Sequence, residues 1–114
     1  MINIKFTRKN GMITRFVITW HAFDGKHAHD IVCAGVSSLA ITTVNSLETL
    51  AHFQPLVEID AVDGGFLDCE IIAELSDKQK EIAQILLQNL ENGVSAIADE
   101  AEYRNFISVT DHDL

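Results

Sequence analysis

Apolar and polar residues alternate at the start of the chain, over residues 2–7, which is the pattern of a half-buried β-strand. Asn10-Gly11 follows, a pair that favours a tight type I′ turn because both central residues of that turn have a positive φ. Residues 12–20 are rich in β-branched and aromatic side chains. We therefore predict an antiparallel hairpin, with His21 directly after its second strand.

The pattern then changes to a helical period. Residues 23–29 are polar and contain one glycine, so we expect a loop there. Asp30 is a favourable N-cap, because its carboxylate can accept a hydrogen bond from a free backbone N–H of the first turn. A helix should follow and end before Pro55. Its expected buried face carries Ile31, Ala34, Ser38, Ile41, Val44, Leu47 and Leu50.

The second half of the chain repeats this arrangement. Two strands, at 56–62 and 66–72, flank the turn residues 63–65, which include a Gly-Gly pair and predict another hairpin. Ser76 and Gln79 have the spacing of a capping box, in which each side chain bonds the other residue's backbone N–H. A second helix should therefore begin directly after Ser76.

This second helix contains Gly93, a weak point at which it could break, and a last strand is expected over 103–110. The predicted order is ββαββαβ. Short connections and helices on one face fit this order. We predict an α/β fold of the α+β type, a two-layer sandwich with a mixed, mainly antiparallel five-stranded sheet and two helices. Residues 1–114 are expected to form a single domain.

The charge balance limits the classes of partner. Eight lysines and arginines against 17 aspartates and glutamates give a net charge of −9. Such a surface repels the phosphates of nucleic acids and of anionic membranes, and it attracts basic proteins. Charged residues interrupt the apolar residues at the N-terminus, so no signal peptide is expected. No stretch of the chain approaches the roughly 18 apolar residues of a membrane span, so none is expected either. We expect a cytoplasmic protein that binds neither nucleic acid nor membrane.

The predicted helix start gives Cys33 a chemical interest. With Asp30 as N-cap, Cys33 is the third helical residue, where free N–H groups and the positive helix end stabilise a thiolate. The loop after His21 can fold back and bring its imidazole beside the sulfur, which is the arrangement of a nucleophile and its base. A buried cysteine on an apolar helix more often serves packing alone. Cys69, in a strand, is expected to be core.

A metal site is a weaker interpretation of the same stretch. His21, His27 and His29 lie close to Asp30 and have the chemistry of zinc ligands. Their spacing matches no standard zinc motif and the chain has no CxxC pair, so a solvated loop is favoured and no metal or other cofactor is expected.

The residues in this region also suggest a family. His21-Ala22, the segment Asp30-Ile31-Val32-Cys33-Ala34, Ser37 and the segment 41–45 occur in an order that resembles the ribosomal-processing cysteine protease (Prp) family. The spacing of twelve residues from His21 to Cys33 fits, and the similarity covers the whole length.

The resemblance implies a function. Members of this family remove a short N-terminal extension from a large-subunit ribosomal protein, and they are typically homodimers. Their catalytic histidine and cysteine correspond to His21 and Cys33. Asp30 and Ser37 correspond to residues that support catalysis or bind substrate. The implied partners are a basic ribosomal protein and a second copy of the chain.

The sequence departs from the family pattern at three positions. Trp20, Phe23 and Ala28 stand where the family usually has glycine, so the loop before the cysteine has less backbone freedom and the pocket is reshaped. A second hypothesis is therefore a noncatalytic ribosome-assembly or regulatory binding protein on the same fold. A third is a metal site at His21, His27 and His29.

Overall fold

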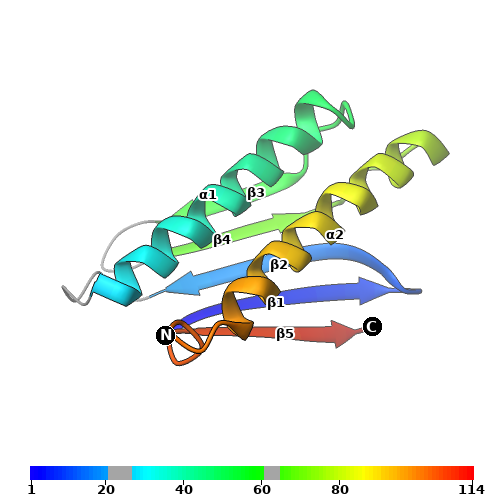
Figure 1. Ribbon diagram of the computed structural model, residues 1–114. Helices are drawn as coiled ribbons and strands as arrows, with labels where there is room; N and C mark the ends of the chain where they lie inside the picture. Colours follow the sequence, from blue (N-terminus) through cyan, green and yellow to red (C-terminus); the bar gives the residue numbers. More distant parts are fainter. Residues whose placement is uncertain (21–26, 61–64) are drawn as a thin grey trace.

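The computed structural model describes residues 1–20, 27–60 and 65–114, without the side chain of His27. The elements follow the predicted order ββαββαβ (Figure 1). They are β1 (Ile2–Lys9), β2 (Met12–Trp20), α1 (His27–Thr49), β3 (Leu56–Asp60), β4 (Gly65–Glu70), α2 (Asp77–Asp99) and β5 (Ile107–Asp113).

The five strands form one sheet in the order β3-β4-β2-β1-β5. Neighbouring strands are antiparallel, except that β1 and β5 run parallel, with Ile2 opposite Ile107. The predicted mixed, mainly antiparallel sheet is confirmed.

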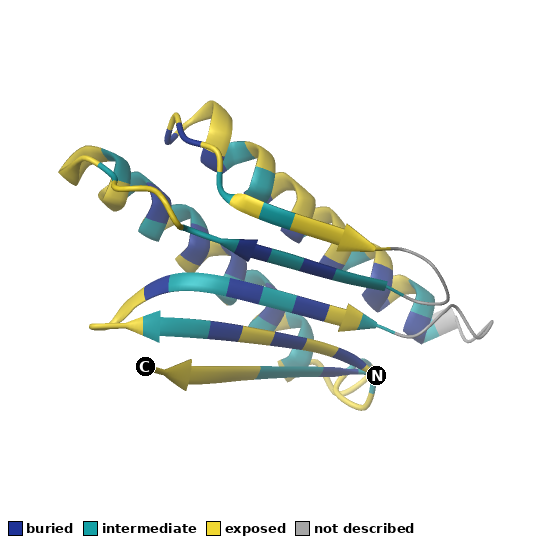
Figure 2. Cartoon of the chain, turned by 180° about the vertical axis from the view of Figure 1, so that it is seen from behind, coloured by how far each residue is buried: buried dark blue, intermediate teal, exposed yellow. Residues whose placement is uncertain are grey.

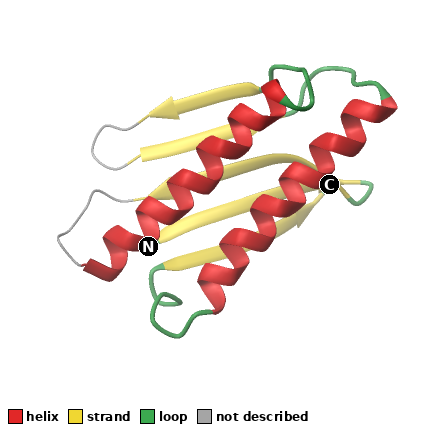
Figure 3. Ribbon diagram, turned by 45° about the horizontal axis from the view of Figure 1, so that its top comes forward, coloured by secondary structure: helices red, strands yellow, loops and turns green. Residues whose placement is uncertain are grey.

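Both helices lie on the same face of the sheet, side by side (Figures 1 and 3). The core fills the space between the two layers, because inward-facing strand residues alternate with exposed ones (Figure 2). Ile4, Phe6 and Phe16 are fully buried there, against Leu47 of α1 and Leu90 of α2 in the same cluster. The two-layer sandwich is thus confirmed.

The first hairpin forms as the sequence predicts. Asn10 and Gly11 have φ angles of 54° and 79°, so both central residues of the turn occupy the left-handed region. Strand β2 has the predicted bounds. The register of β1 against β2 shifts between Thr7 and Arg8, where a bulge interrupts the pairing.

Helix α1 begins earlier than predicted. It starts at His27, so His27 to His29 are helical and Asp30 lies inside the first turn instead of capping the helix. Ala28 promotes this early start, because alanine is the strongest helix former and glycine, which the family usually has here, is among the weakest.

The predicted buried face of α1 is wrong over the first half of the helix. Val32, Val36 and Ala40 face the core, whereas Ile31 and Ile41 are 41% and 42% exposed. Ala34 and Ser38 are exposed as well, so small and apolar side chains form much of the outward face of this helix. The second half of the predicted stripe is partly confirmed, because Val44 packs against the core and Leu47 is fully buried, whereas Leu50 is exposed.

Helix α2 starts at the predicted capping box. The Ser76 hydroxyl accepts a bond from the backbone N–H of Gln79, and the Gln79 side chain accepts one from the N–H of Ser76. The helix does not break at Gly93. A Cβ there would lie 3.0 Å from Leu39 Cδ1, so this glycine allows α1 and α2 to approach closely.

Strand β5 is displaced from its prediction. It covers Ile107–Asp113 rather than 103–110, because residues 101–106 form turns that end with the N–H of Phe106 bonded to the carbonyl of Tyr103. Arg8 fastens this edge, since its guanidinium binds Glu91 of α2 at 2.6 Å and Asp111 of β5 at 3.0 Å.

Helix α1 is notably apolar. Over Ala28–Thr49 it is long and apolar enough to cross a membrane by length and composition alone, contrary to the expectation that no stretch of the chain approaches a span. The core helix of a soluble domain passes the same test. In the structure α1 packs its Val32 and Val36 against the sheet.

Candidate active site

Cys33 lies one turn deeper in its helix than predicted. It is the seventh residue of α1 and is only 4% exposed. The N–H of the seventh helical residue bonds the carbonyl four residues earlier, so it is not one of the four free donors of the helix start. The prediction that the Cys33 N–H lies among free donors is therefore wrong, and the effect of the helix end on its thiol is weaker.

The imidazole of His29 lies against the sulfur of Cys33. The Sγ atom is 4.0 Å from Nδ1 and 3.9 Å from Nε2 of His29, at the long limit for a hydrogen bond to sulfur. His29 is 3% exposed, and its ring makes an edge contact with Phe106. The expectation of a solvated loop histidine is wrong. A ring nitrogen in this place can accept the thiol proton or donate to a thiolate.

Asp30 lies beside the same imidazole. Its Oδ1 is 3.7 Å from His29 Nδ1, and this oxygen is buried without a hydrogen-bond partner among the described residues. The predicted role of Asp30 as the N-cap of this helix is excluded, because α1 starts at His27. A buried carboxylate oxygen without a partner is available to a donor from another group.

Ser37 follows Cys33 by one helical turn and is exposed. The two residues line the same void of about 150 Å³, together with Trp20 of β2, and the void is too narrow to hold a water molecule. The structure therefore brings Cys33, Ser37 and Trp20 together at one end of the sheet.

Trp20 has a specific place in this arrangement. It pairs with Gly65 across the β2–β4 ladder, and a Cβ on Gly65 would lie 2.7 Å from Trp20 Cε2. The indole thus lies over Gly65. A tryptophan at this position, where the family usually has glycine, is accommodated because the opposite residue has no side chain.

Two of the predicted site features lie outside the described residues. These are His21, the expected base, and Phe23. The hypothesis of a metal site at His21, His27 and His29 is not tested for the same reason. Within the described ranges 1–20, 27–60 and 65–114, no group of three potential metal ligands is found.

Cys69 occupies a different environment from Cys33. It is 2% exposed in β4, and burial, followed by the charge of Asp68, raises the pKa of its thiol to about 12. A thiol with this pKa remains protonated and is a poor nucleophile. The prediction that Cys69 belongs to the core is confirmed.

Comparison with known proteins agrees with the resemblance. The family model described as cysteine protease Prp matches residues 1–108. The ribosomal processing cysteine protease Prp of Bacillus subtilis is 34% identical over 98 residues, which are 86% of this chain and 85% of that protein. The protein of the same name from Staphylococcus aureus is 30% identical over 101 residues, 88% of this chain and 91% of its own.

Solved structures share the fold over nearly the whole chain. The SMU.848 protein of Streptococcus mutans superposes with a TM-score of 0.88 at 30% identity, covering 100% of this chain and 96% of that one. The S. aureus protease Prp with a covalently linked product peptide superposes with a TM-score of 0.79 at 28% identity, covering 98% of this chain and 100% of that one. The match extends across the strands and helices that position Cys33. The chain therefore belongs to the Prp family of cysteine proteases.

Proposed function

We propose that this chain is an endopeptidase that removes a short N-terminal extension from a large-subunit ribosomal protein, through a covalent acyl-enzyme on Cys33. The observation that carries the proposal is family membership combined with a buried cysteine that contacts an imidazole. The S. aureus relative carries a covalently linked product peptide, which supports covalent catalysis.

The reaction has two halves. In the first, a histidine takes the Cys33 proton, the thiolate attacks the scissile carbonyl carbon, and the histidine returns the proton to the leaving amine as the C–N bond breaks. In the second half the same histidine takes a proton from water. The resulting hydroxide adds to the thioester carbonyl and displaces the Cys33 thiolate, which takes the proton back from the histidine. The new C-terminal carboxylic acid then releases its proton to water. No cofactor is needed, because each proton and electron pair remains within the enzyme, substrate and water.

The base in this proposal is His21, as the resemblance implies. The position of His29 against Cys33 Sγ makes this second histidine a partner of the sulfur in the free enzyme. Asp30 carries a buried oxygen that suits orientation of His21 or of a substrate amide. Ser37, one turn after Cys33, is placed to bond substrate, and Trp20 restricts which side chains fit beside the sulfur.

The partners follow from charge. Ribosomal proteins are basic, and a net charge of −9 favours their approach while it disfavours direct contact with nucleic acid and anionic membranes. Ribosomal-protein processing takes place where ribosomes assemble, so we assign the protein to the cytoplasm.

We also propose that the protein is a homodimer. The outward face of α1, formed by Ile31, Ala34, Ser38 and Ile41, exposes apolar and small side chains suited to a self-complementary contact. Sedimentation analysis of Ile41→Glu should give a monomer, whereas Asn92→Glu on the exposed side of α2 should not change the mass. Equal masses for the two variants would remove α1 from the interface.

The cleavage assay uses the precursor of a large-subunit ribosomal protein with an N-terminal extension, analysed by mass spectrometry. We expect one shortened product with the parent enzyme and none with Cys33→Ala, while Cys69→Ala retains cleavage. Persistent cleavage by Cys33→Ala would disprove the assignment of the nucleophile.

The pH dependence of Cys33 alkylation separates the two histidines. In the parent, we expect reaction with a small thiol reagent well below the free-cysteine pKa of about 8.5. The His21→Ala variant should lose both this reactivity and cleavage, whereas His29→Ala should retain cleavage with an altered pH profile. Loss of cleavage in His29→Ala alone would transfer the role of base to His29.

The second candidate function is a noncatalytic binding protein. The observation that favours it is the replacement of the usual loop glycine by Ala28 inside a helix that begins at His27. A Cys33 thiol of ordinary reactivity, indifferent to both histidine substitutions, together with normal ribosome assembly in cells carrying Cys33→Ala, would establish this alternative.

A further inference from the structure

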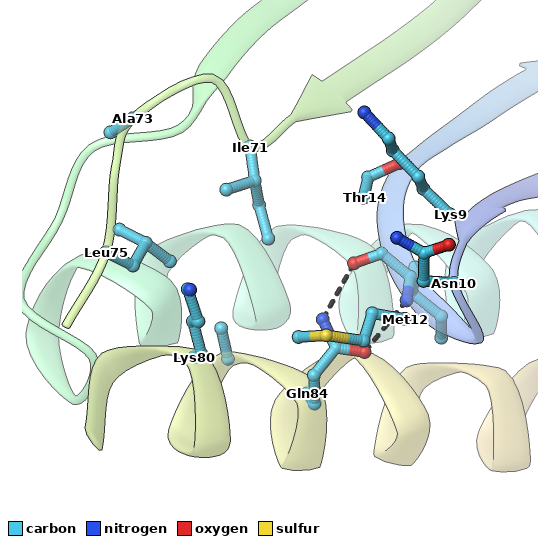
Figure 4. A pocket seen from close by; sticks show the side chains of 11 residues that line it. Lys9, Asn10, Met12, Thr14, Ile71, Ala73, Leu75, Lys80 and Gln84 are labelled. Atoms are coloured by element: carbon cyan, nitrogen blue, oxygen red, sulfur yellow. Dashed lines mark hydrogen bonds between the residues drawn. The ribbon is translucent and has the colours of Figure 1, made fainter. Parts of the chain in front are cut away.

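A cavity of about 230 Å³ opens at the end of the sheet opposite Cys33 (Figure 4). Ile2, at the start of β1, lines the void beside Cys33, whereas Lys9, at the end of the same strand, lines this cavity. Ile2 and Lys9 are the first and last residues of β1, so the two places lie about 23 Å apart along the strand. The cavity is therefore not part of the site described above.

The walls of the cavity are mostly apolar. Met12 and Ile13 come from β2, Ile71 and Leu75 from the segment between β4 and α2, and Ala83 from α2. Apolar walls with a few polar groups at fixed places are typical of sites for small organic molecules. The cavity is small, so it suits a fragment-sized ligand.

The cavity is held in shape by Gln84. Its side-chain amide donates to the carbonyl of Ile13 and its side-chain oxygen accepts from the N–H of Ile13, both at 2.8 Å (Figure 4). These two bonds hold the turn end of the first hairpin against α2. A ligand would therefore enter a site that is already formed, without first having to order the hairpin.

Two lysines give the cavity its charge. Lys9 comes from the hairpin side and Lys80 from α2, on opposite walls (Figure 4). Arg8 and Arg15 form ion pairs with carboxylates, whereas the ammonium groups of Lys9 and Lys80 have no such pair among the described residues. No acidic residue of the described ranges lines the cavity, although the chain carries 17 aspartates and glutamates.

We propose that this cavity is a second binding site, which takes a small organic carboxylate with an apolar body. The apolar part occupies the space between Ile71, Leu75 and Ala83, and the carboxylate lies between Lys9 and Lys80. A single ammonium at an exposed site attracts an anion weakly, but two from opposite walls select the sign of the ligand.

The test measures binding of 3-phenylpropionate by chemical-shift changes of the ¹⁵N-labelled protein. The matched probes are 3-phenylpropanamide, which has no charge, and 3-phenylpropylamine, which has the opposite charge. For the acid we expect saturable shifts at the amides of residues 12–14, 71–75 and 80–84, with a dissociation constant on the order of 1 mM. The amide should bind several-fold more weakly, and the amine should not bind.

Variants locate the site and its charge. The double variant Lys9→Gln, Lys80→Gln should bind the acid several-fold more weakly and the amide as tightly as the parent does. Lys78 also belongs to α2 but does not line the cavity, so Lys78→Gln should leave the binding of both probes unchanged. Ala73→Trp should block both probes. Absence of saturable shifts, equal binding of acid and amine, or shifts elsewhere would overturn the proposal. None of these measurements involves peptide cleavage, so they are independent of the proposed function.

Discussion

The two cysteines show how strongly the environment decides the chemistry of one residue type. Both are buried, at 4% and 2% exposure, and both belong to the hydrophobic core. Cys33 contacts the ring of His29, which can exchange a proton with it, whereas Cys69 lies beside the carboxylate of Asp68, which opposes ionisation. Of the two thiols, Cys33 therefore has the partner that the proposed role as nucleophile needs, whereas burial and Asp68 keep the thiol of Cys69 protonated.

Cys69 should make the folded state less stable in alkali. Its pKa is raised from 9.0 to about 12, so the folded state keeps a proton that the unfolded state loses above pH 9. The contribution to stability is fully present below pH 9. It is lost as the pH rises toward 12, by up to about 1.4 kcal/mol per pH unit.

Urea unfolding of the parent and of Cys69→Ala, at about pH 8 and about pH 10.5, measures this contribution. At about pH 8 the Cys69→Ala variant has a lower free energy of unfolding than the parent, because the substitution leaves a cavity. Between about pH 8 and about pH 10.5, however, this free energy should fall less in the variant than in the parent. Parallel losses in the two proteins would show that Cys69 ionises alike in the folded and unfolded states.

For single residues, the sequence indicates which side chains are chemically reactive but not which of them lie in contact. It marks Cys33 through its motif and its helix, and the choice of Cys69 as core needs only its place in a strand. The contact of His29 with Cys33 depends on whether His29 is helical, because residues four apart lie on one face only in a helix. A helix that starts at His27, four residues earlier than predicted, brings His29 and Cys33 onto one face.

Elements with strong local signals were predicted correctly, and those with ambiguous signals were not. Asn10-Gly11 and the Ser76 capping box each use one short interaction that the sequence specifies fully. Helix α1 is apolar on most sides, so two stripes of similar spacing compete and only packing on the sheet chooses between them. An aspartate is equally favourable at a cap and in the first turn, which misplaced the start of α1.

The contact of β2 with β4 near the candidate site should be sensitive to a single methyl group. In Gly65→Ala the new Cβ would lie 2.7 Å from Cε2 of the Trp20 ring and 2.8 Å from the carbonyl oxygen of Asp60. Either the start of β4 or the indole of Trp20 must therefore move. We expect a loss of about 1–3 kcal/mol in stability. A shift in the fluorescence of Trp20, the only tryptophan, should accompany this loss.

Gly35→Ala is the matched control. Its Cβ would meet only Ile97 Cδ1, at an ordinary 3.6 Å, and alanine favours the helix, so stability should rise by roughly 0.5–1 kcal/mol with unchanged fluorescence. Equal stability of the two variants in chemical unfolding would contradict the close packing of Trp20 on Gly65.

For the whole molecule, the proposed function and the net charge of −9 together predict that a basic substrate is attracted at long range. Salt screens such attraction, so the rate of cleavage of a basic precursor at low substrate concentration should fall several-fold between about 20 mM and about 200 mM salt. A peptide with the same cleavage site and acidic flanks serves as the control. Its rate of cleavage should rise or stay constant as the salt concentration increases. If both substrates respond alike, salt acts on the enzyme itself rather than on the encounter.

The parallel pairing of β1 with β5 determines when the molecule can fold during its synthesis. Ile2 pairs with Ile107, so one edge of β1 stays unpaired until β5, more than a hundred residues later in the chain, has left the ribosome. The hairpin of β1 and β2 can close early, but its free edge remains open to other nascent chains in the meantime. The sheet is completed only after β5 has emerged, so this protein reaches its native state only once its other strands and both helices have been synthesised.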